Sequence, residues 1–158
     1  MDEATRKEFL ARIKRDVSAL TENDRDLMKH IVPVILRMTA DPRMGPLTLL
    51  TPDEEALKRL GLDDDEEIAP ELRDPLLGLF LDQVILGTLP APEALDGASM
   101  AFSTLGGASA TVTLEEGNLV LTDTCQRKVR VSEPVMDTPK VIWRMSDDLL
   151  MWDEWSWL

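Results

Sequence analysis

Hydrophobic residues recur at helical spacing in the first part of the chain. Over roughly the first 20 residues they share one face of a predicted helix: Phe9, Leu10, Ile13, Val17 and Leu20. A second helix is expected to start at Thr21 with Asp24. Its apolar side is formed by Leu27, Met28, Ile31, Ile35 and Met38. Because Pro33 lacks a backbone N–H, we expect it to kink or divide this second helix.

The pattern changes abruptly within LTLLTPDEEAL, residues 47–57. Its first four residues predict a short apolar strand, and a helix follows without a spacer. Thr51 is the predicted N-cap and Pro52 the first helical residue, where a missing N–H does no harm. Glu54 lies three residues after Thr51, so the two residues are expected to form a capping box.

A further helix is predicted after Asp74 and Pro75, which serve as its cap and first residue. Its apolar residues are Leu76, Leu77, Leu79, Phe80, Val84 and Ile85. Gly87 is the expected end of the helix. The stretch PAPEAL, residues 90–95, is expected to form one short helical turn.

From Ser99 onward the period changes from helical spacing to alternation. The segments SMAFSTL, SATVTLEE, NLVLTD, QRKVRVSE and KVIWRMS read as strands, and turn signals separate them. These turns are Gly106-Gly107, Gly117-Asn118 and the stretch from Pro134 to Pro139. Helices followed by strands indicate an α+β fold, with the N-terminal helices packed on an antiparallel sheet or small β-sandwich.

Composition limits the class of protein. The chain has 158 residues, 44% of them hydrophobic, which suits one globular domain. A net charge of −13 disfavours nucleic acid and anionic membrane surfaces as partners. No apolar run is long enough to predict a transmembrane segment. Cys125 is the single cysteine, so no internal disulfide is expected.

In order and spacing these segments resemble a fasciclin-type (FAS1) domain. LTLLTPDEEAL is similar to the first conserved box of that family. FLDQVILGTLPAPEAL, residues 80–95, resembles the helix and turn that follow it, and residues 102–121 resemble the next strand and hairpin. Residues 139–151 match the last box in rhythm. The resemblance implies a wedge-shaped α+β domain over residues 16–151, with a helical extension at 1–15 and a tail at 152–158.

The chain departs from the family at positions that carry polar side chains there. Asp82 and Gln83 stand where the family has Tyr-His. Pro139 and Lys140 replace an Asn-Gly turn, and Trp143 replaces a second histidine. We therefore expect the buried polar network of the family to be missing or rebuilt.

Candidate catalytic and metal-binding residues are few. His30 is the only histidine and is interpreted as a helix-surface or boundary residue, since no His or Cys spacing supports a zinc site. Cys125 lacks the local features of a nucleophile. The acidic run at 63–67 lacks the ligand order of a calcium loop and is interpreted as a solvated loop, with weak cation binding left open. No cofactor is predicted.

The last residues, MWDEWSWL, contain three of the four tryptophans. In one interpretation the tail folds back and its tryptophans seal the core. In a second it is a docking segment, because tryptophan is enriched at binding hot spots. Membrane-interface anchoring is a third. The candidate partner-binding residues are Trp152, Trp155, Trp157 and Leu158.

The resemblance implies a non-enzymatic protein–protein interaction or adhesion module. One alternative is a soluble accessory subunit docked on a larger complex, which an acidic body suits if the partner surface is basic or mixed. The sequence is also compatible with a small-ligand carrier and with a hydrolase that uses Cys125. The expected location is extracellular or a lumen if a targeting peptide was removed, and intracellular otherwise.

Overall fold

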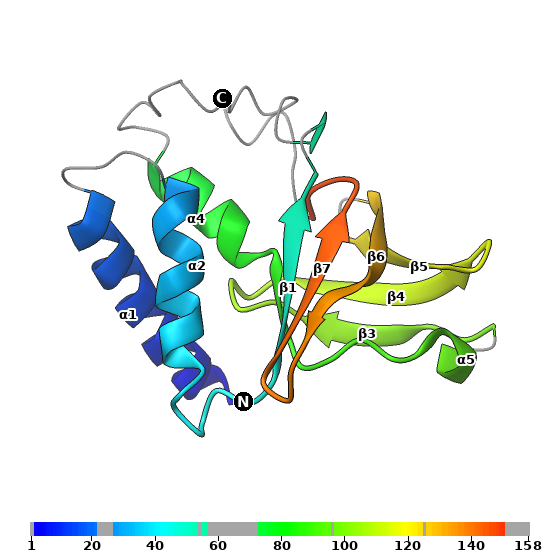
Figure 1. The fold of residues 1–158 in the computed structure, drawn as a ribbon, viewed down its shortest axis with the longest axis horizontal. Coiled ribbons are helices and arrows are strands. Elements are labelled where there is room, and N and C mark those ends of the chain that lie inside the picture. Colours follow the sequence, from blue (N-terminus) through cyan, green and yellow to red (C-terminus); the bar gives the residue numbers. More distant parts are fainter. Residues whose placement is uncertain are drawn as a thin grey trace.

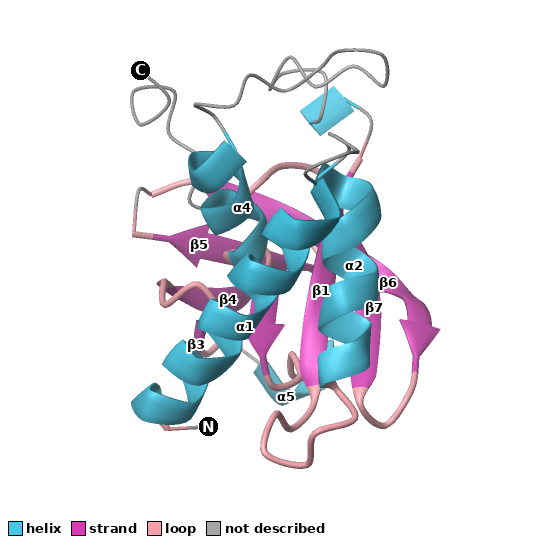
Figure 2. Cartoon of the chain, turned by 90° about the vertical axis from the view of Figure 1, so that its left-hand side faces the viewer, coloured by secondary structure: helices cyan, strands magenta, loops and turns pink. Residues whose placement is uncertain are grey.

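The first two helices form a layer on one side of the molecule (Figures 1 and 2). In this computed structural model the described residues are 2–21, 27–53, 55–56, 73–95, 97–124 and 126–150. Helix α1 spans Glu3–Thr21 and buries Phe9, Ile13 and Val17 completely. Leu20, which was predicted on the same face, is exposed. The predicted boundary between residues 15 and 16 falls inside this helix, and the division into domains stays a prediction.

Helix α2 spans Leu27–Met38 and continues through Pro33, so Pro33 does not divide this helix, and the expected kink stays a prediction. Pro33 lies on the exposed side of α2, while Val34 and Ile35 on the other side are buried. Burial of this apolar face holds the helix together although one backbone donor is missing.

The third described helix, α4, spans Arg73–Leu81, so it begins two residues before Pro75. It also ends earlier than predicted, because Val84 and Ile85 belong to the short strand β2, Val84–Leu86. Both residues pair with β1, and β-branched side chains suit a strand that is buried in this way. The predicted helical turn is confirmed as α5, Pro92–Leu95.

The strands form one seven-stranded sheet in the order β2-β1-β7-β6-β5-β4-β3. Besides β2, they are β1 (Leu47–Pro52), β3 (Met100–Ser103), β4 (Ser109–Glu115), β5 (Asn118–Asp123), β6 (Lys128–Asp137) and β7 (Val141–Ser146). All neighbours are antiparallel except β1 and β7, which run parallel. The sheet is therefore mixed, and the expectation of a purely antiparallel sheet is wrong. The reason is topological: β7 returns to pair beside the first strand.

The sheet curls until its two ends meet. Ile85 of β2 forms a bridge with Thr104, just after β3, and the Leu105 N–H donates to the Val84 carbonyl at 2.7 Å. One buried cluster lies between the helices and β1, β2 and β7. A second lies among β1, β2, β4, β5 and β6, together with Leu95 and Leu150.

Candidate functional site

The junction after β1 is built differently from the sequence prediction. Thr51 and Pro52 stay in the strand, paired with β7, and the Asp53 N–H donates to the Ser146 carbonyl at 2.9 Å. The Ala56 N–H then donates to Asp53 Oδ1 at 2.9 Å, which is the hydrogen bond of an N-cap. Asp53 is therefore the cap in place of Thr51, because pairing with β7 carries the strand two residues further. Glu54 of the predicted capping box lies outside the described residues.

The hydroxyl of Thr51 instead accepts a hydrogen bond from a neighbouring strand of the sheet. Trp143 of β7 donates its Nε1–H to Thr51 Oγ1. The Trp143 side chain is partly buried and contacts the cluster beneath the helices. Trp143 thus packs against this cluster and forms a hydrogen bond with the neighbouring strand β1.

Gln83 is almost completely buried, with 3% of its surface exposed. Its side-chain Nε2 donates to the carbonyls of Leu79 at 3.0 Å and Leu150 at 2.8 Å. Its Oε1 accepts from the Leu150 N–H at 2.9 Å. Both hydrogens of the side-chain amide are used, and they link Leu79 of α4 to Leu150.

Asp82, beside it, faces the β3–β4 hairpin. Thr104 Oγ1 donates to Asp82 Oδ1 at 2.8 Å and itself accepts from the Ala108 N–H at 3.0 Å. Arg6 of α1 donates to the Leu105 carbonyl at 3.0 Å, which brings its positive charge to the same hairpin. Burial raises the pKa of the Asp82 carboxyl, while Thr104, Ala108 and Arg6 act in the opposite direction. This cluster ties α1 and the end of α4 to the hairpin.

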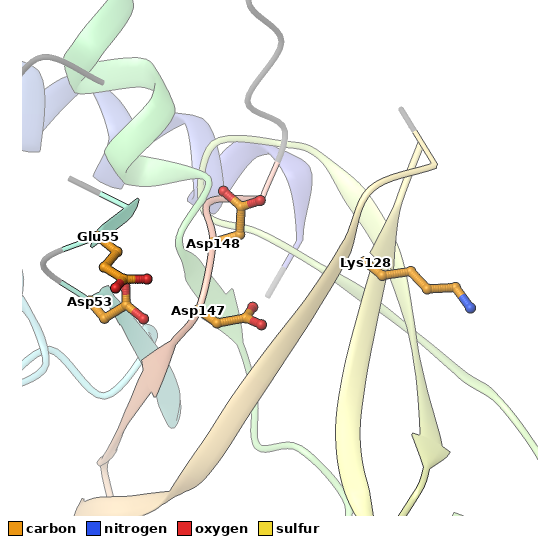
Figure 3. A pocket seen from close by; sticks show the side chains of 5 residues that line it. All are labelled: Asp53, Glu55, Lys128, Asp147 and Asp148. Atoms are coloured by element: carbon orange, nitrogen blue, oxygen red, sulfur yellow. The ribbon is translucent and has the colours of Figure 1, made fainter. Parts of the chain in front are cut away.

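An open depression of about 490 Å³ lies at the end of β1 and β7 (Figure 3). Its lining residues are Asp53, Glu55, Lys128, Asp147 and Asp148. Lys128 points away from the carboxylates in this view and bonds to Glu115 at 2.8 Å. The lining of the depression therefore carries a net negative charge.

Three of the carboxylates in the depression accept hydrogen bonds from other residues of the domain. Asp53 caps the helix that follows β1. Asp147 Oδ1 accepts from the Arg130 N–H at 2.8 Å, and Asp148 accepts from Arg127 and from the Leu149 N–H. Among the described residues no group of His, Cys, Asp or Glu is arranged to hold a metal ion. The depression is thus an acidic surface, and its three aspartates form hydrogen bonds within the domain.

The outer half of β6 is the most exposed apolar part of the described structure. Residues 128–131 pair with β5, whereas 132–137 have pairing partners on β7 only. Val135 is 62% exposed and Met136 37%. The register shifts on both sides of Pro134, so β6 continues as a strand where a turn was predicted. Because proline has no backbone N–H, its place at such an irregularity leaves no hydrogen-bond donor of the strand without a partner.

The structure describes only some of the residues that were predicted to bind a partner or to react. His30 lies on α2 and is partly buried. Cys125, the acidic run 63–67 and the candidate contact residues Trp152, Trp155, Trp157 and Leu158 lie outside the described residues. None of the described helices is long and apolar enough to cross a bilayer.

Three features of the structure were not predicted from the sequence. They are the polar contacts of Gln83, the cap at Asp53 and the exposed pair on β6. The first two depend on contacts between segments that are distant in the sequence. For the third, the signal in the sequence was an alternating strand with Pro134 inside it.

Comparison with known proteins supports a class of fold. No family model matches the chain, and no curated protein matches it. Among solved structures it is similar to the FAS1 domain pair of the insect cell adhesion molecule Fasciclin I, with a TM-score of 0.57 and 13% identity. The match covers 87% of this chain and 51% of that one, so the chain spans about half the length of the domain pair. The fold is therefore α+β and FAS1-like, and the likeness is structural.

Proposed function

We propose that this protein is a non-enzymatic protein–protein interaction module of the adhesion type. A FAS1-like fold supports this proposal because the similar solved structure comes from a cell adhesion molecule. Fold alone does not define function, so support must also come from a surface of this chain.

The observation that carries the proposal is the exposed segment of β6, residues 132–137. Two large apolar residues, Val135 and Met136, follow each other in the strand there, and both side chains are exposed to water. Exposed carboxylates of Glu133 and Asp137 flank them. Apolar side chains rimmed by polar ones are typical of protein contact sites. Pro134 and the register shifts disfavour pairing with another strand, so contact is expected through side chains.

The acidic depression supports a non-enzymatic role more than a catalytic one. Asp53, Asp147 and Asp148 each accept a backbone hydrogen bond within the domain. A general acid or base needs a carboxyl that is available to substrate.

We also propose that Trp152, Trp155, Trp157 and Leu158 form a second contact segment. Tryptophan offers a large apolar area with one polar group, which suits binding hot spots. With an acidic body, the expected partner surface is basic or mixed, as in an accessory subunit of a larger assembly.

The test is an affinity capture from the native source, quantified by mass spectrometry. The wild type is compared with Val135→Ser/Met136→Ser and with Trp152/Trp155/Trp157→Ser. Met100→Ser is the matched control, because Met100 is similarly exposed but lies on β3. All variants are first checked for native circular dichroism.

A stoichiometric partner that is retained by Met100→Ser and lost with the β6 variant supports the surface proposed here. Loss with the tryptophan variant identifies the tail as a contact segment as well. If both variants capture as much as the wild type, both contact sites are wrong. Capture of no stoichiometric partner by the wild type contradicts the interaction module itself.

A further inference from the structure

The exposed segment of β6, residues 132–137, carries acidic side chains that have no partner within the described domain. In the part of the chain that the structure describes, neither the Glu133 nor the Asp137 carboxylate forms a hydrogen bond or an ion pair. Both residues are exposed. At the other end of β6 the charges are paired, since Lys128 bonds to Glu115 at 2.8 Å. The two carboxylates of the segment are therefore available to a cation of another molecule.

A cation of the domain lies near these carboxylates on the neighbouring strand β7. Arg144 pairs with Pro134 in the register of the two strands, and its Nη1 donates to the Ser132 carbonyl at 2.8 Å. Burial lowers the pKa of Arg144, and the carboxylates of Asp137 and Glu133 act in the opposite direction, which places both of them near this guanidinium. Two carboxylates beside one guanidinium leave one negative charge in excess at this surface.

The apolar residues of the segment stand between these acidic residues. Val135 and Met136 follow each other in the strand, and both are exposed. Because a strand rises about 3.3 Å per residue, the backbone positions of Glu133 and Asp137 are at most about 13 Å apart. An exposed segment of a partner can therefore place an apolar side chain on this pair and a basic side chain on a carboxylate at either end.

We propose that the partner of this segment presents an apolar side chain next to lysine or arginine. This inference rests on the contact role proposed above for residues 132–137. The net charge of −13 attracts a basic segment and repels a second copy of this chain. It likewise disfavours an anionic lipid surface. The apolar contact supplies buried area, and the carboxylates select partners of the opposite sign.

The probe for this chemistry is a library of short random peptides displayed on phage. Peptides are selected on the immobilised wild-type protein after removal of those that bind Val135→Ser/Met136→Ser, so the remaining binders recognise this segment. We expect lysine or arginine next to an apolar residue to be enriched, and aspartate and glutamate to be depleted. If no peptide is enriched, or if the enriched peptides lack basic residues, the proposed partner chemistry is wrong.

Two charge variants then test whether the carboxylates select the peptide. Glu133→Gln/Asp137→Asn removes both charges of the segment, and Asp16→Asn/Glu93→Gln is the matched control, because it makes the same exchanges on α1 and α5. The dissociation constant of an enriched peptide is measured by fluorescence anisotropy. The first variant is expected to raise it about 5-fold, the effect of two exposed ion pairs. A rise no greater than that of the control overturns the inference, since net charge alone would then explain it.

Failure of the proposed function is seen separately, in the affinity capture. A captured partner that is lost with the β6 variant, together with enriched peptides that lack basic residues, leaves the contact segment in place and removes only the partner chemistry. Capture by the β6 variant at the level of the wild type contradicts the contact segment itself.

Discussion

Replacing Gly106 by alanine tests the polar junction between α4 and the β3–β4 hairpin. A Cβ at this position would lie 2.3 Å from Asp82 Oδ1 and 3.3 Å from the Asp82 backbone nitrogen. The first distance is far below van der Waals contact, so Asp82 must turn away. That movement breaks the 2.8 Å hydrogen bond from Thr104, whose hydroxyl is buried.

The magnitude follows from three contributions. Overpacking costs about 1–3 kcal/mol, and the lost hydrogen bond costs about 1 kcal/mol. Alanine also reduces the freedom of the unfolded chain, which returns about 0.4–1 kcal/mol. We therefore expect Gly106→Ala to lower the free energy of unfolding by about 1–3.5 kcal/mol, measured by urea denaturation followed by circular dichroism.

Gly78 provides a matched control. It lies in α4, a Cβ added there would meet no atom within 4 Å, and its backbone is not restricted to a positive φ. Gly78→Ala is expected to raise the free energy of unfolding by about 0.5–1 kcal/mol, because alanine favours the helix. The same substitution thus has opposite signs at two glycines.

A double-mutant cycle separates the clash from general damage to the hairpin. In an Asp82→Ala background the nearest obstructing atoms are gone, so Gly106→Ala is expected to cost at least about 1 kcal/mol less than in the wild type. An equal cost in both backgrounds, or a stable Gly106→Ala single variant, refutes the reasoning.

Three further predictions concern polar groups of the described structure. Burial raises the pKa of the Asp82 carboxyl, so ionisation of this group opposes folding. The variant Asp82→Asn is therefore expected to have a higher melting temperature than the wild type at pH 7. This difference should shrink as the pH falls through the raised pKa. A constant difference over pH 3–7, a range spanning the usual carboxyl titration, would argue against this. Trp143→Phe removes the hydrogen bond to Thr51 and should cost about 0.5–1.5 kcal/mol in urea denaturation, with a smaller cost in a Thr51→Val background. Hydrogen bonds from Arg43 lower the pKa of Asp41 to about 2, so the ionised carboxylate favours folding. The variant Asp41→Asn should therefore be less stable than the wild type at neutral pH. Melting temperatures measured at decreasing pH should show this difference disappearing toward pH 2.

The helices and strands follow closely from local patterns. Phe9, Ile13 and Val17 are four residues apart and fall on one face of any helix, which is the face that α1 buries. The alternation of residues 109–115 and 118–123 likewise predicts β4 and β5 with the turn between them. Such periods depend on neighbouring residues alone, so one sequence is enough to recognise them.

The candidate site follows from the sequence less well. Asp82 and Gln83 were recognisable as departures from a resemblance, but their partners Thr104 and Leu150 lie far along the chain. The exposed state of Val135 was equally hidden, because it depends on β5 stopping its pairing at Val131. Contacts between distant segments leave no period in a single sequence.

The sequence by itself therefore determined most of the helices and strands, several of their apolar faces and the acidic charge. Only the tertiary structure decided that β7 runs parallel to β1, that Val84 and Ile85 form a strand, and that Asp53 caps the helix after β1. In each case a hydrogen-bonding partner from a distant segment outweighed the local preference. Backbone groups buried in a domain must find partners, and the fold as a whole decides which partners are within reach.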